Sequence, residues 1–223
     1  MKTKVIIFGT SQYSLFLYQT LKREDRDEVV AFTVHRRFIT SNEIESLPVI
    51  PFEDIDNYVD IKGCKIALTI GYKKLNDNRK RIYDECKIRG LNLYTFISKN
   101  ALCYSDEIGE GSIVLPGSYI GPYVKVGIAC CIHIDVWLSH NITIGDFTYI
   151  AGGTMVGGTC SIGKSCFIGM SCTLKNGIHV EDRTFLGANS YLADNTLAGK
   201  AYVGSPAQNP NNIRSEMMMA FVE

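Results

Sequence analysis

His133 and His140 are two of only four histidines in this chain of 223 residues, and both lie in the stretch CIHIDVWLSHNITIGDFTYIAGG, residues 131–153. An imidazole can take a proton from a nucleophile near neutral pH, so each is a candidate general base. The stretch is periodic, because an aliphatic residue stands at every sixth position. What lies beside each imidazole therefore depends on how the repeat folds.

The six-residue repeat continues without a miss through fifteen aliphatic positions in the second half of the chain. A fixed period indicates a solenoid, in which each unit buries its apolar residue against neighbouring units. The residue after the aliphatic one is often glycine, where we expect a tight corner with a positive φ. The aliphatic positions are Ile108, Val114, Ile120, Val126, Ile132, Leu138, Ile144, Ile150, Val156, Ile162, Ile168, Leu174, Val180, Leu186 and Leu192. The glycines that follow are Gly109, Gly121, Gly127, Gly145, Gly157, Gly163, Gly169 and Gly187.

Neither a helix nor a flat antiparallel sheet fits this pattern. Glycine at this density disfavours a helix, and a flat antiparallel sheet requires alternation in twos. We therefore predict a coil with short straight sides and sharp corners, in which three six-residue sides make one turn of about eighteen residues. The fifteen aliphatic positions then correspond to about five stacked turns.

The predicted turn places a glycine beside one of the two histidines. His140 lies two positions after Leu138 on an outward-facing side, and Gly158 lies one full turn later. An imidazole beside an exposed backbone N–H offers a base for a nucleophile and a donor for a tetrahedral oxyanion, the pair that acyl transfer needs. A surface histidine at a subunit contact explains the same pattern equally well.

The first half of the chain predicts an α/β unit. KVIIF, EVVAFTV, KIALTI and LYTFI are apolar strands, and LFLYQTLKRE and LNDNRKRIYDECKIRG are helices. The loop Gly9–Ser14 brings backbone N–H groups to a helix N-terminus, where a phosphate can bind. It lacks the spacing G-x-G-x-x-G, which disfavours a redox dinucleotide, and a plain structural turn explains it equally well.

Composition and charge exclude several classes of partner. Lysine plus arginine and aspartate plus glutamate both number 23, so we expect no nucleic acid and no anionic membrane surface as partner. The apolar run near the N-terminus is too short for a signal peptide, so we expect a cytoplasmic protein. Four of the eight cysteines occupy one phase of the repeat and are expected to pack as small structural residues: Cys130, Cys160, Cys166 and Cys172.

The segments IGDFTYI, IGKSCFI and VGSPAQ resemble the hexapeptide-repeat acyltransferases. Within them the chain is similar to sugar-nucleotide acetyltransferases such as the bacillosamine and perosamine N-acetyltransferases and the sialic acid O-acetyltransferase-like proteins. The resemblance implies a left-handed parallel β-helix and a homotrimer with active sites between subunits. We expect a Rossmann-like sugar-nucleotide-binding domain at 1–100, the β-helix at 101–197, and a C-terminal loop and short capping helix at 198–223.

The resemblance also implies roles for particular residues. His140 takes the place of the catalytic base, and Gly158 that of the glycine whose N–H meets the acetyl carbonyl. Residues implied to bind acetyl-CoA are Gly158, Tyr149, Ala188 and Pro206, the last in a loop over the adenine end of CoA. Residues implied to bind the sugar nucleotide are Gly9, Ser11, Tyr13, Arg36, Gly71 and Lys73, with His133 near the sugar.

The chain departs from the family pattern in three places. Gln12 and Tyr13 replace a glycine and a histidine of the phosphate loop, and basic residues replace acidic ones after the second strand. Arg36 there fits either a pyrophosphate or a solvated edge. Asn141 replaces the acidic residue that follows the catalytic histidine, so Asp135 and Asp146 are alternative carboxylates for orienting the imidazole.

The resemblance implies an N-acetyltransferase that uses acetyl-CoA and acts on a nucleotide-linked amino sugar in bacterial surface-glycan biosynthesis. O-acetylation of a nonulosonic acid or another sugar uses the same machinery, and a non-catalytic sugar-nucleotide-binding protein is a third alternative. The γ-class carbonic anhydrases share the β-helix. Their zinc needs three converging histidines, which the four in this chain do not supply, so we expect no metal.

Overall fold

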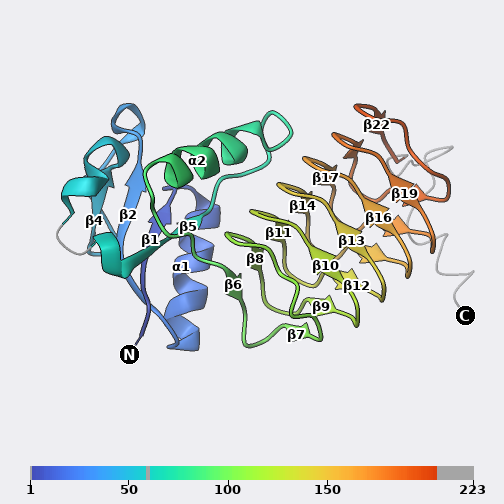
Figure 1. Ribbon diagram of the computed structural model, residues 1–223, viewed down its shortest axis with the longest axis horizontal. Helices are drawn as coiled ribbons and strands as arrows, with labels where there is room; N and C mark the ends of the chain where they lie inside the picture. Colours follow the sequence, from blue (N-terminus) through green and yellow to red (C-terminus); the bar gives the residue numbers. More distant parts are fainter. Residues whose placement is uncertain (1, 59–60, 205–223) are drawn as a thin grey trace, which may run out of the picture.

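The computed structural model describes residues 2–58 and 61–204, and in it an α/β half leads into a long stack of short strands (Figure 1). The sheet of the α/β half has the strand order β3-β4-β2-β1-β5, and all of its pairings are parallel except that of β3 with β4. Its strands are β1 (Lys4–Phe8), β2 (Glu28–Val34), β3 (Glu43–Ile44), β4 (Leu47–Pro51) and β5 (Cys64–Leu68). Its helices are α1 (Gln12–Glu24) and α2 (Asp77–Ile88), with 3-10 turns η1 (Arg36–Phe38), η2 (Phe52–Asn57) and η3 (Ile61–Gly63).

The predicted strands and helices of this half are present with shifted limits. Helix α1 begins three residues before the predicted LFLYQTLKRE segment, because Ser11 caps it and its N–H donates to Ser14 Oγ at 3.2 Å. The short strands β3 and β4 were not predicted. The predicted strand LYTFI is divided, since Leu93 bridges to Ile66 of β5 whereas Phe96 and Ile97 belong to the next part of the fold.

The second half consists of three parallel sheets of two-residue strands, the sides of a coil that rises along one axis (Figure 1). The seven-stranded sheet contains β6 (Phe96–Ile97), β8 (Ile113–Val114), β11 (Cys131–Ile132), β14 (Tyr149–Ile150), β17 (Phe167–Ile168), β20 (Phe185–Leu186) and β22 (Ala201–Tyr202). The six-stranded sheet contains β7 (Leu102–Cys103), β9 (Tyr119–Ile120), β12 (Trp137–Leu138), β15 (Met155–Val156), β18 (Thr173–Leu174) and β21 (Tyr191–Leu192). The four-stranded sheet contains β10 (Lys125–Val126), β13 (Thr143–Ile144), β16 (Ser161–Ile162) and β19 (His179–Val180).

This arrangement confirms the predicted fold class, an α/β half followed by a left-handed parallel β-helix. The register is one turn per eighteen residues in the central coils; for example, Leu138 pairs with Val156 and Val156 with Leu174. The repeat positions from Val114 to Leu192 are all buried in a single core that runs along the axis, and Ile108 packs against its end. Burial of this column of aliphatic side chains is the main force that stacks the turns.

The expectation that the repeated glycines adopt a positive φ is wrong. The left-handed conformation instead falls three positions after the aliphatic residues from Ile108 to Leu186, where it is adopted by Asp135 (φ 54°), Asn141 (φ 56°) and Gly153 (φ 70°), among others. The glycine directly after the aliphatic residue is needed for space. A Cβ on Gly145 would lie 2.6 Å from the Gly163 carbonyl carbon and 2.7 Å from Lys164 N in the next coil. At Gly145 the successive coils approach too closely for a side chain.

Serine, threonine and cysteine share one position of the six-residue repeat, two residues before the aliphatic one, and their side chains make hydrogen bonds there. From Ser112 to Cys172, each hydroxyl or thiol at this position donates to a backbone carbonyl fifteen residues later: for example, Ser112 Oγ to Gly127 O at 2.8 Å, Thr148 Oγ1 to Gly163 O at 2.7 Å and Cys130 Sγ to Gly145 O at 3.2 Å. Burial raises the pKa of the Cys130 thiol to about 12 and that of Cys166 to about 11. These thiols therefore stay protonated and act as buried donors that tie one corner to the next.

The coil extends beyond the predicted five turns at both ends. At the start, Phe96 pairs with Ile113, seventeen residues away, and at the end Phe185 pairs with Ala201, sixteen residues away. These end coils are shorter than eighteen residues, so their core residues do not fall on the sixth positions of the repeat. Ile97 and Tyr202 still pack against the core. The first β-helix strand thus begins at Phe96, five residues before the predicted start of the β-helix at residue 101. The predicted capping helix lies outside the described residues.

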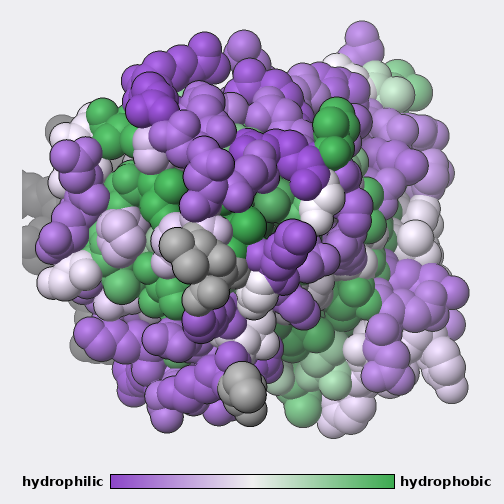
Figure 2. Space-filling view, turned by 60° about the vertical axis from the view of Figure 1, so that its left-hand side comes forward, coloured by the Kyte–Doolittle hydropathy of each residue, from purple (hydrophilic) through white to green (hydrophobic). Residues whose placement is uncertain are grey.

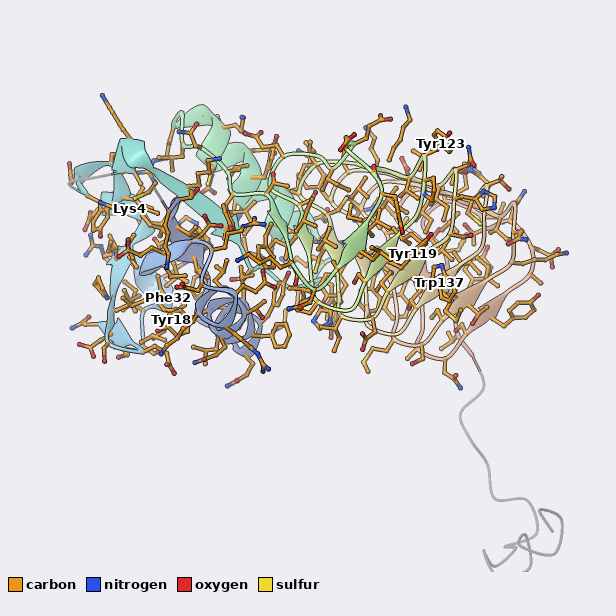
Figure 3. The ribbon with its side chains drawn as sticks, turned by 90° about the horizontal axis from the view of Figure 1, so that it is seen from below. Lys4, Tyr18, Phe32, Tyr119, Tyr123 and Trp137 are labelled. Atoms are coloured by element: carbon orange, nitrogen blue, oxygen red, sulfur yellow. The ribbon has the colours of Figure 1, made fainter. Side chains whose placement is uncertain are left out.

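Contacts from α2 and the loop before it hold the two halves together. Asn76 Nδ2 donates to Cys166 O at 2.9 Å, and Arg79 Nη2 donates to Phe147 O at 3.1 Å. Arg79 is 1% exposed, and its guanidinium lies 5.6 Å from the centre of the Tyr149 ring. In Figure 3, Tyr18 and Phe32 mark the α/β half, and Tyr119 and Trp137 mark the β-helix beyond it.

A change at one glycine tests the close approach of the coils. We expect Gly145→Ala to reduce the free energy of unfolding by about 1–3 kcal/mol, because its methyl group would overlap backbone atoms that cannot move independently. The matched control is Gly63→Ala, since nothing lies within 4 Å of a Cβ at Gly63; its effect should stay within about 0.5 kcal/mol. The measurement is the urea midpoint at one fixed protein concentration. Equal midpoints for Gly145→Ala and the wild type would contradict this explanation of the repeated glycines.

Candidate active site

His140 stands at the corner after β12, exposed to solvent. Its Nδ1 lies 3.0 Å from Asn141 Oδ1. Since the amide oxygen is an acceptor, this contact assigns the proton to Nδ1 and leaves Nε2 as the free lone pair. Asn141 lies in the left-handed conformation, which asparagine adopts at lower cost than most residues. One residue therefore makes the corner and orients the imidazole.

Neither alternative carboxylate contacts His140. Asp146 lies at another corner, where its Oδ1 accepts the Ile128 N–H at 3.1 Å and its Oδ2 pairs with Lys164 Nζ at 3.0 Å. Asp135 occupies the left-handed position of the corner before β12. The side chain that orients the imidazole is thus the neutral amide of Asn141.

Gly158 lies one coil above His140, as the pairing of β12 with β15 requires. The imidazole covers it so closely that a Cβ on Gly158 would be 2.6 Å from His140 Nε2. The Gly158 N–H is engaged, because it donates to Asn176 Oδ1 at 3.0 Å. The sequence argument assumed an open donor at this position, and a ligand oxygen can reach it only by replacing that amide oxygen.

A second group of predicted residues lies around a cavity of about 440 Å³ on the outer side of the seven-stranded sheet. Aromatic rings form its wall: Tyr149 and Phe167 stack at 5.7 Å, and Phe167 and Phe185 at 5.1 Å. Tyr72, from the loop after β5, closes the side towards the α/β half and lies 4.4 Å from the Phe167 ring. His133 and Ala188 also line the cavity, so it is mainly apolar with one imidazole at its edge.

Burial lowers the pKa of His133, so this imidazole is neutral at pH 7. The ring of Tyr13, from the start of α1, lies 6.0 Å from the His133 ring, and the Tyr13 hydroxyl lies 3.0 Å from Cys131 Sγ. Burial also raises the pKa of Tyr13 well above its usual value. Tyr13 and His133 therefore form one contact between the loop Gly9–Ser14 and the β-helix.

The predicted nucleotide-binding residues follow the carboxyl ends of parallel strands. Gly9 follows β1, Arg36 follows β2, and Gly71 and Lys73 follow β5, so these segments share one edge of the sheet. The strand order changes direction at β1, and ligands of open α/β sheets bind at such a point. Gly9 has φ 139°, and a Cβ there would lie 2.7 Å from Thr69 Oγ1, so only glycine fits.

Arg36 is held by carboxylates at this edge. Its guanidinium pairs with Asp54 Oδ2 at 2.5 Å, and its N–H donates to Glu53 Oε2 at 2.8 Å. His35 lies between Glu53 and Glu85, at 3.2 and 3.3 Å. His35 and Arg36, after the second strand, thus form ion pairs with nearby acidic side chains. The Arg36 guanidinium could meet a phosphate only by leaving Asp54.

The predicted site residues fall at two different corners of the coil. Tyr149, His133 and Ala188 meet at the corner that follows the seven-stranded sheet, whereas His140 and Gly158 meet at the corner that follows the six-stranded sheet. Pro206 lies outside the described residues. Sequence reasoning missed Tyr72 and Asn176, and it missed Phe167 and Phe185, which follow Tyr149 at intervals of eighteen and could have been found from the period.

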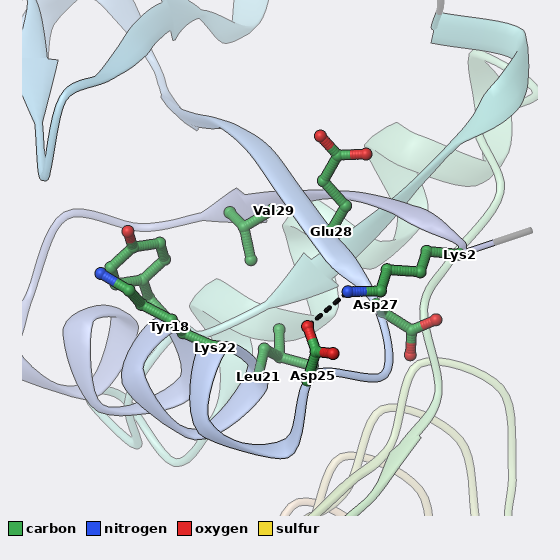
Figure 4. A pocket seen from close by; sticks show the side chains of 8 residues that line it. All are labelled: Lys2, Tyr18, Leu21, Lys22, Asp25, Asp27, Glu28 and Val29. Carbon is green, nitrogen blue, oxygen red and sulfur yellow. Dashed lines mark hydrogen bonds and ion pairs between the residues drawn. The ribbon is translucent and has the colours of Figure 1, made fainter.

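A further hollow lies away from the predicted site residues. A cavity of about 420 Å³ lies near the C-terminus of α1, at the opposite edge of the sheet from the phosphate loop, where Lys2 pairs with Asp25 (Figure 4). None of the predicted site residues lines it. In the part of the chain that the structure describes, no three His, Cys, Asp or Glu side chains converge as a metal site would require. Over the same residues, no helix has the length and apolarity needed to cross a membrane.

The β-helix matches a known repeat family over part of its length. Residues 160–193 match the model described as the hexapeptide repeat of succinyl-transferase. Among solved structures, the acetyltransferase domain of PglB from Neisseria gonorrhoeae FA1090 aligns with a TM-score of 0.82 at 19% identity, over 93% of this chain and 99% of that chain.

Two further structures align over nearly the whole described chain. PerB from Caulobacter crescentus, in complex with CoA and GDP-perosamine, has a TM-score of 0.80 at 20% identity, with 92% of this chain and 96% of that chain covered. WeeI from Acinetobacter baumannii AYE has a TM-score of 0.79 at 20% identity, with coverage of 92% and 99%. At these identities the likeness establishes the fold: an α/β half joined to a hexapeptide-repeat β-helix.

The partly buried imidazole of His133 makes the stability of the fold depend on pH. Its pKa is lower in the folded than in the unfolded chain, so the unfolded state binds more protons as the pH falls below about 6.5. Stability is therefore full above that pH and decreases below it, until the pH reaches the folded pKa. We expect the urea midpoint to fall less between pH 7.5 and 5.5 for His133→Asn than for the wild type. The same fall in both would contradict a buried neutral His133.

Proposed function

We propose that the protein is an acetyl-CoA-dependent N-acetyltransferase that acts on a nucleotide-linked amino sugar. The observation that carries this proposal is the corner at which His140, oriented by Asn141, lies against the backbone of Gly158. It stands in a fold that also occurs in a protein solved with CoA and GDP-perosamine. A base and an amide donor at adjacent positions are what transfer from a thioester to an amine requires.

The sugar nucleotide is proposed to bind at the carboxyl edge of the α/β sheet. Its phosphates would meet the N-terminus of α1 near Gly9 and Ser11, where the helix dipole and backbone N–H groups favour an anion. From there the sugar would extend past Tyr13 towards the aromatic cavity and His133. Gly71 and Lys73, in the loop that carries Tyr72, lie on the same edge.

The aromatic cavity, which would hold the acceptor sugar, and His140, the proposed base, lie at successive corners of one coil. One subunit does not bring them together, so a complete site needs a second subunit. We therefore propose a homotrimer in which the phosphate loop and aromatic cavity of one subunit face His140 and Gly158 of the next. The outer side of the six-stranded sheet supports a contact there, because it exposes large side chains: Trp137 at 50%, Met155 at 46% and Tyr191 at 66%. Figure 2, turned so that the α/β half comes forward, shows hydrophobic side chains among hydrophilic ones on that face of the molecule.

In the proposed mechanism, the sugar amine attacks the carbonyl carbon of acetyl-CoA while His140 Nε2 accepts a proton from the nitrogen. The new C–N bond forms as the carbonyl oxygen becomes an oxyanion, which the Gly158 N–H stabilises. Collapse of this intermediate breaks the C–S bond, and CoA leaves as its thiolate. An amine suits a base oriented by a neutral amide, because it needs less activation than an alcohol.

The proposed reaction belongs to bacterial surface-glycan biosynthesis in the cytoplasm. Seven of the eight cysteines are buried, and Cys130 and Cys166 are thiols that donate to backbone carbonyls, as suits a reducing compartment. A panel of amino and hydroxy sugar nucleotides, with release of CoA thiol as the readout, tests the acceptor class. Transfer only to hydroxyl groups would replace the N-acetyltransferase proposal with O-acetylation, and no CoA binding by calorimetry would favour a non-catalytic binding protein.

Removal of the proposed base is the direct test of the mechanism. We expect His140→Ala to lower kcat by about 10²–10⁴-fold, because the change removes the proposed general base. The control is His179→Ala, since His179 also lies on the β-helix surface but belongs to β19 of the four-stranded sheet and bonds Glu181 Oε1 at 3.0 Å. Its kcat should stay within about twofold of the wild type. A His140→Ala variant that retains most of kcat would remove His140 as the base.

Mixed trimers test whether one site draws on two subunits. Ser11 is exposed at the phosphate loop, so Ser11→Trp should block the nucleotide without disturbing the core. We expect His140→Ala and Ser11→Trp each to be inactive as homotrimers, whereas co-assembly restores about a quarter of wild-type sites for random mixing. Activity is measured after co-expression and purification with two tags. No recovery in co-purified mixed trimers would contradict a shared site.

A further inference from the structure

The corners of the β-helix contain a repeated hydrogen bond from a backbone N–H to an aspartate or asparagine one coil later. Ile128 N–H donates to Asp146 at 3.1 Å, Lys164 N–H to Asp182 at 2.7 Å, and Gly158 N–H to Asn176 at 3.0 Å. The first two bonds lie at one corner and use carboxylates. The third lies at the His140 corner and uses a neutral amide.

The bond to Asn176 can be released without moving the backbone. Gly158 O accepts the Gly177 N–H at 2.9 Å, and His140 O accepts the Thr159 N–H at 2.9 Å, so both coils stay in place through main-chain bonds. Gly157 leaves room for the side chain, because a Cβ there would overlap Asn176 Oδ1. Asn176 itself is exposed, and rotation of its side chain would place the amide in water.

Asn176 also faces a hollow beside the catalytic corner. A cavity of about 420 Å³ along the outer side of the six-stranded sheet is lined by Trp137, Ser139, Gly157, Lys175, Asn176 and Tyr191. A thioester carbonyl that approaches from this hollow towards His140 meets the Gly158 N–H at the position that Asn176 Oδ1 now occupies. The amide oxygen is thus a stand-in for the carbonyl oxygen of the donor.

We propose that Asn176 is a positioning residue, which holds the Gly158 N–H in the empty site and exchanges it for the thioester oxygen when acyl-CoA binds. This inference rests on the proposed acyltransferase function. In the exchange, one N–H···O bond to the Asn176 amide breaks and one to the thioester carbonyl forms, and no covalent bond changes. The donor is therefore already aimed when the oxyanion develops.

The neutral amide is essential to this role. A carboxylate would hold the Gly158 N–H in a charge-assisted bond, roughly twice as strong as one between neutral groups. Its negative charge would also lie beside the developing oxyanion and oppose it. The aspartates at the other corner have no such exchange to permit, so a permanent bond is suitable there.

The test compares Asn176→Asp with Asn176→Ala. Aspartate keeps the shape but locks the N–H, so we expect kcat to fall by about 10²-fold or more with KM for the acceptor unchanged. Alanine frees the N–H, and kcat should stay within about fivefold of the wild type. The matched control is Asp182→Asn, which makes the reverse change at a corner remote from His140 and should leave kcat unchanged. Thermal midpoints of all variants are measured in parallel.

The outcomes separate this inference from the proposed function. If the wild type transfers the acetyl group and kcat is unchanged in both Asn176→Asp and Asn176→Ala, the exchange role is overturned while the acyltransferase proposal stays intact. A fall in kcat for Asn176→Ala as large as that for Asn176→Asp would do the same, because it would make Asn176 necessary rather than displaceable. Absence of transfer by the wild type with every acceptor would overturn both.

Discussion

Every feature of the β-helix depends on the stacking of one aliphatic side chain above another at intervals of eighteen residues. That register buries the column from Val114 to Leu192 and sets strands such as β12 and β15 side by side. As a result, the neighbour of a corner residue in the central coils is found by adding eighteen to its number. His140, Gly158 and Asn176 form one such column, and Asp146, Lys164 and Asp182 belong to another. The repeat that makes the fold thus also determines which groups can act together.

The period could be read from the sequence, and it predicts a coil of about eighteen residues per turn with His140 beside Gly158, whereas the left-handed β-helix was implied by the family resemblance. The reason for the repeated glycines could not be read from the sequence. Glycine occurs both where φ is positive and where no space is left for a side chain, and a sequence does not distinguish the two. The left-handed positions were hidden, since residues as different as Asn141, Phe147 and Arg183 occupy them. A sequence also does not reveal that the Gly158 N–H already has an acceptor, which depends on the conformation of Asn176.

Contacts between the two halves have no period and were not predicted. Arg79 is buried at this junction with Nη2 bonded to Asn76 Oδ1 and Phe147 O, while its Nε and Nη1 have no hydrogen-bond partner within the described residues. No carboxylate balances it there in the described part of the chain; the ring of Tyr149 lies against it instead. Burial of a cation in this way is costly, so the junction must hold one arrangement. That arrangement places Tyr72 on the rim of the aromatic cavity, because Asn76 ends the loop that carries Tyr72 and binds Cys166 O.

The choice between asparagine and aspartate distinguishes a structural corner from the proposed catalytic one. Both residues accept a backbone N–H with the same geometry, so either would hold the coils together. At the corner of Asp146 and Asp182, carboxylates accept backbone N–H groups, and Asp146 also pairs with Lys164, which adds fixed bonds. At the His140 corner, both Asn141 and Asn176 are neutral. A carboxylate at either position would raise the basicity of the imidazole or oppose an oxyanion, and the first effect would favour alcohol acceptors. The neutral set therefore argues for an amine acceptor and for a donor N–H that can change partners.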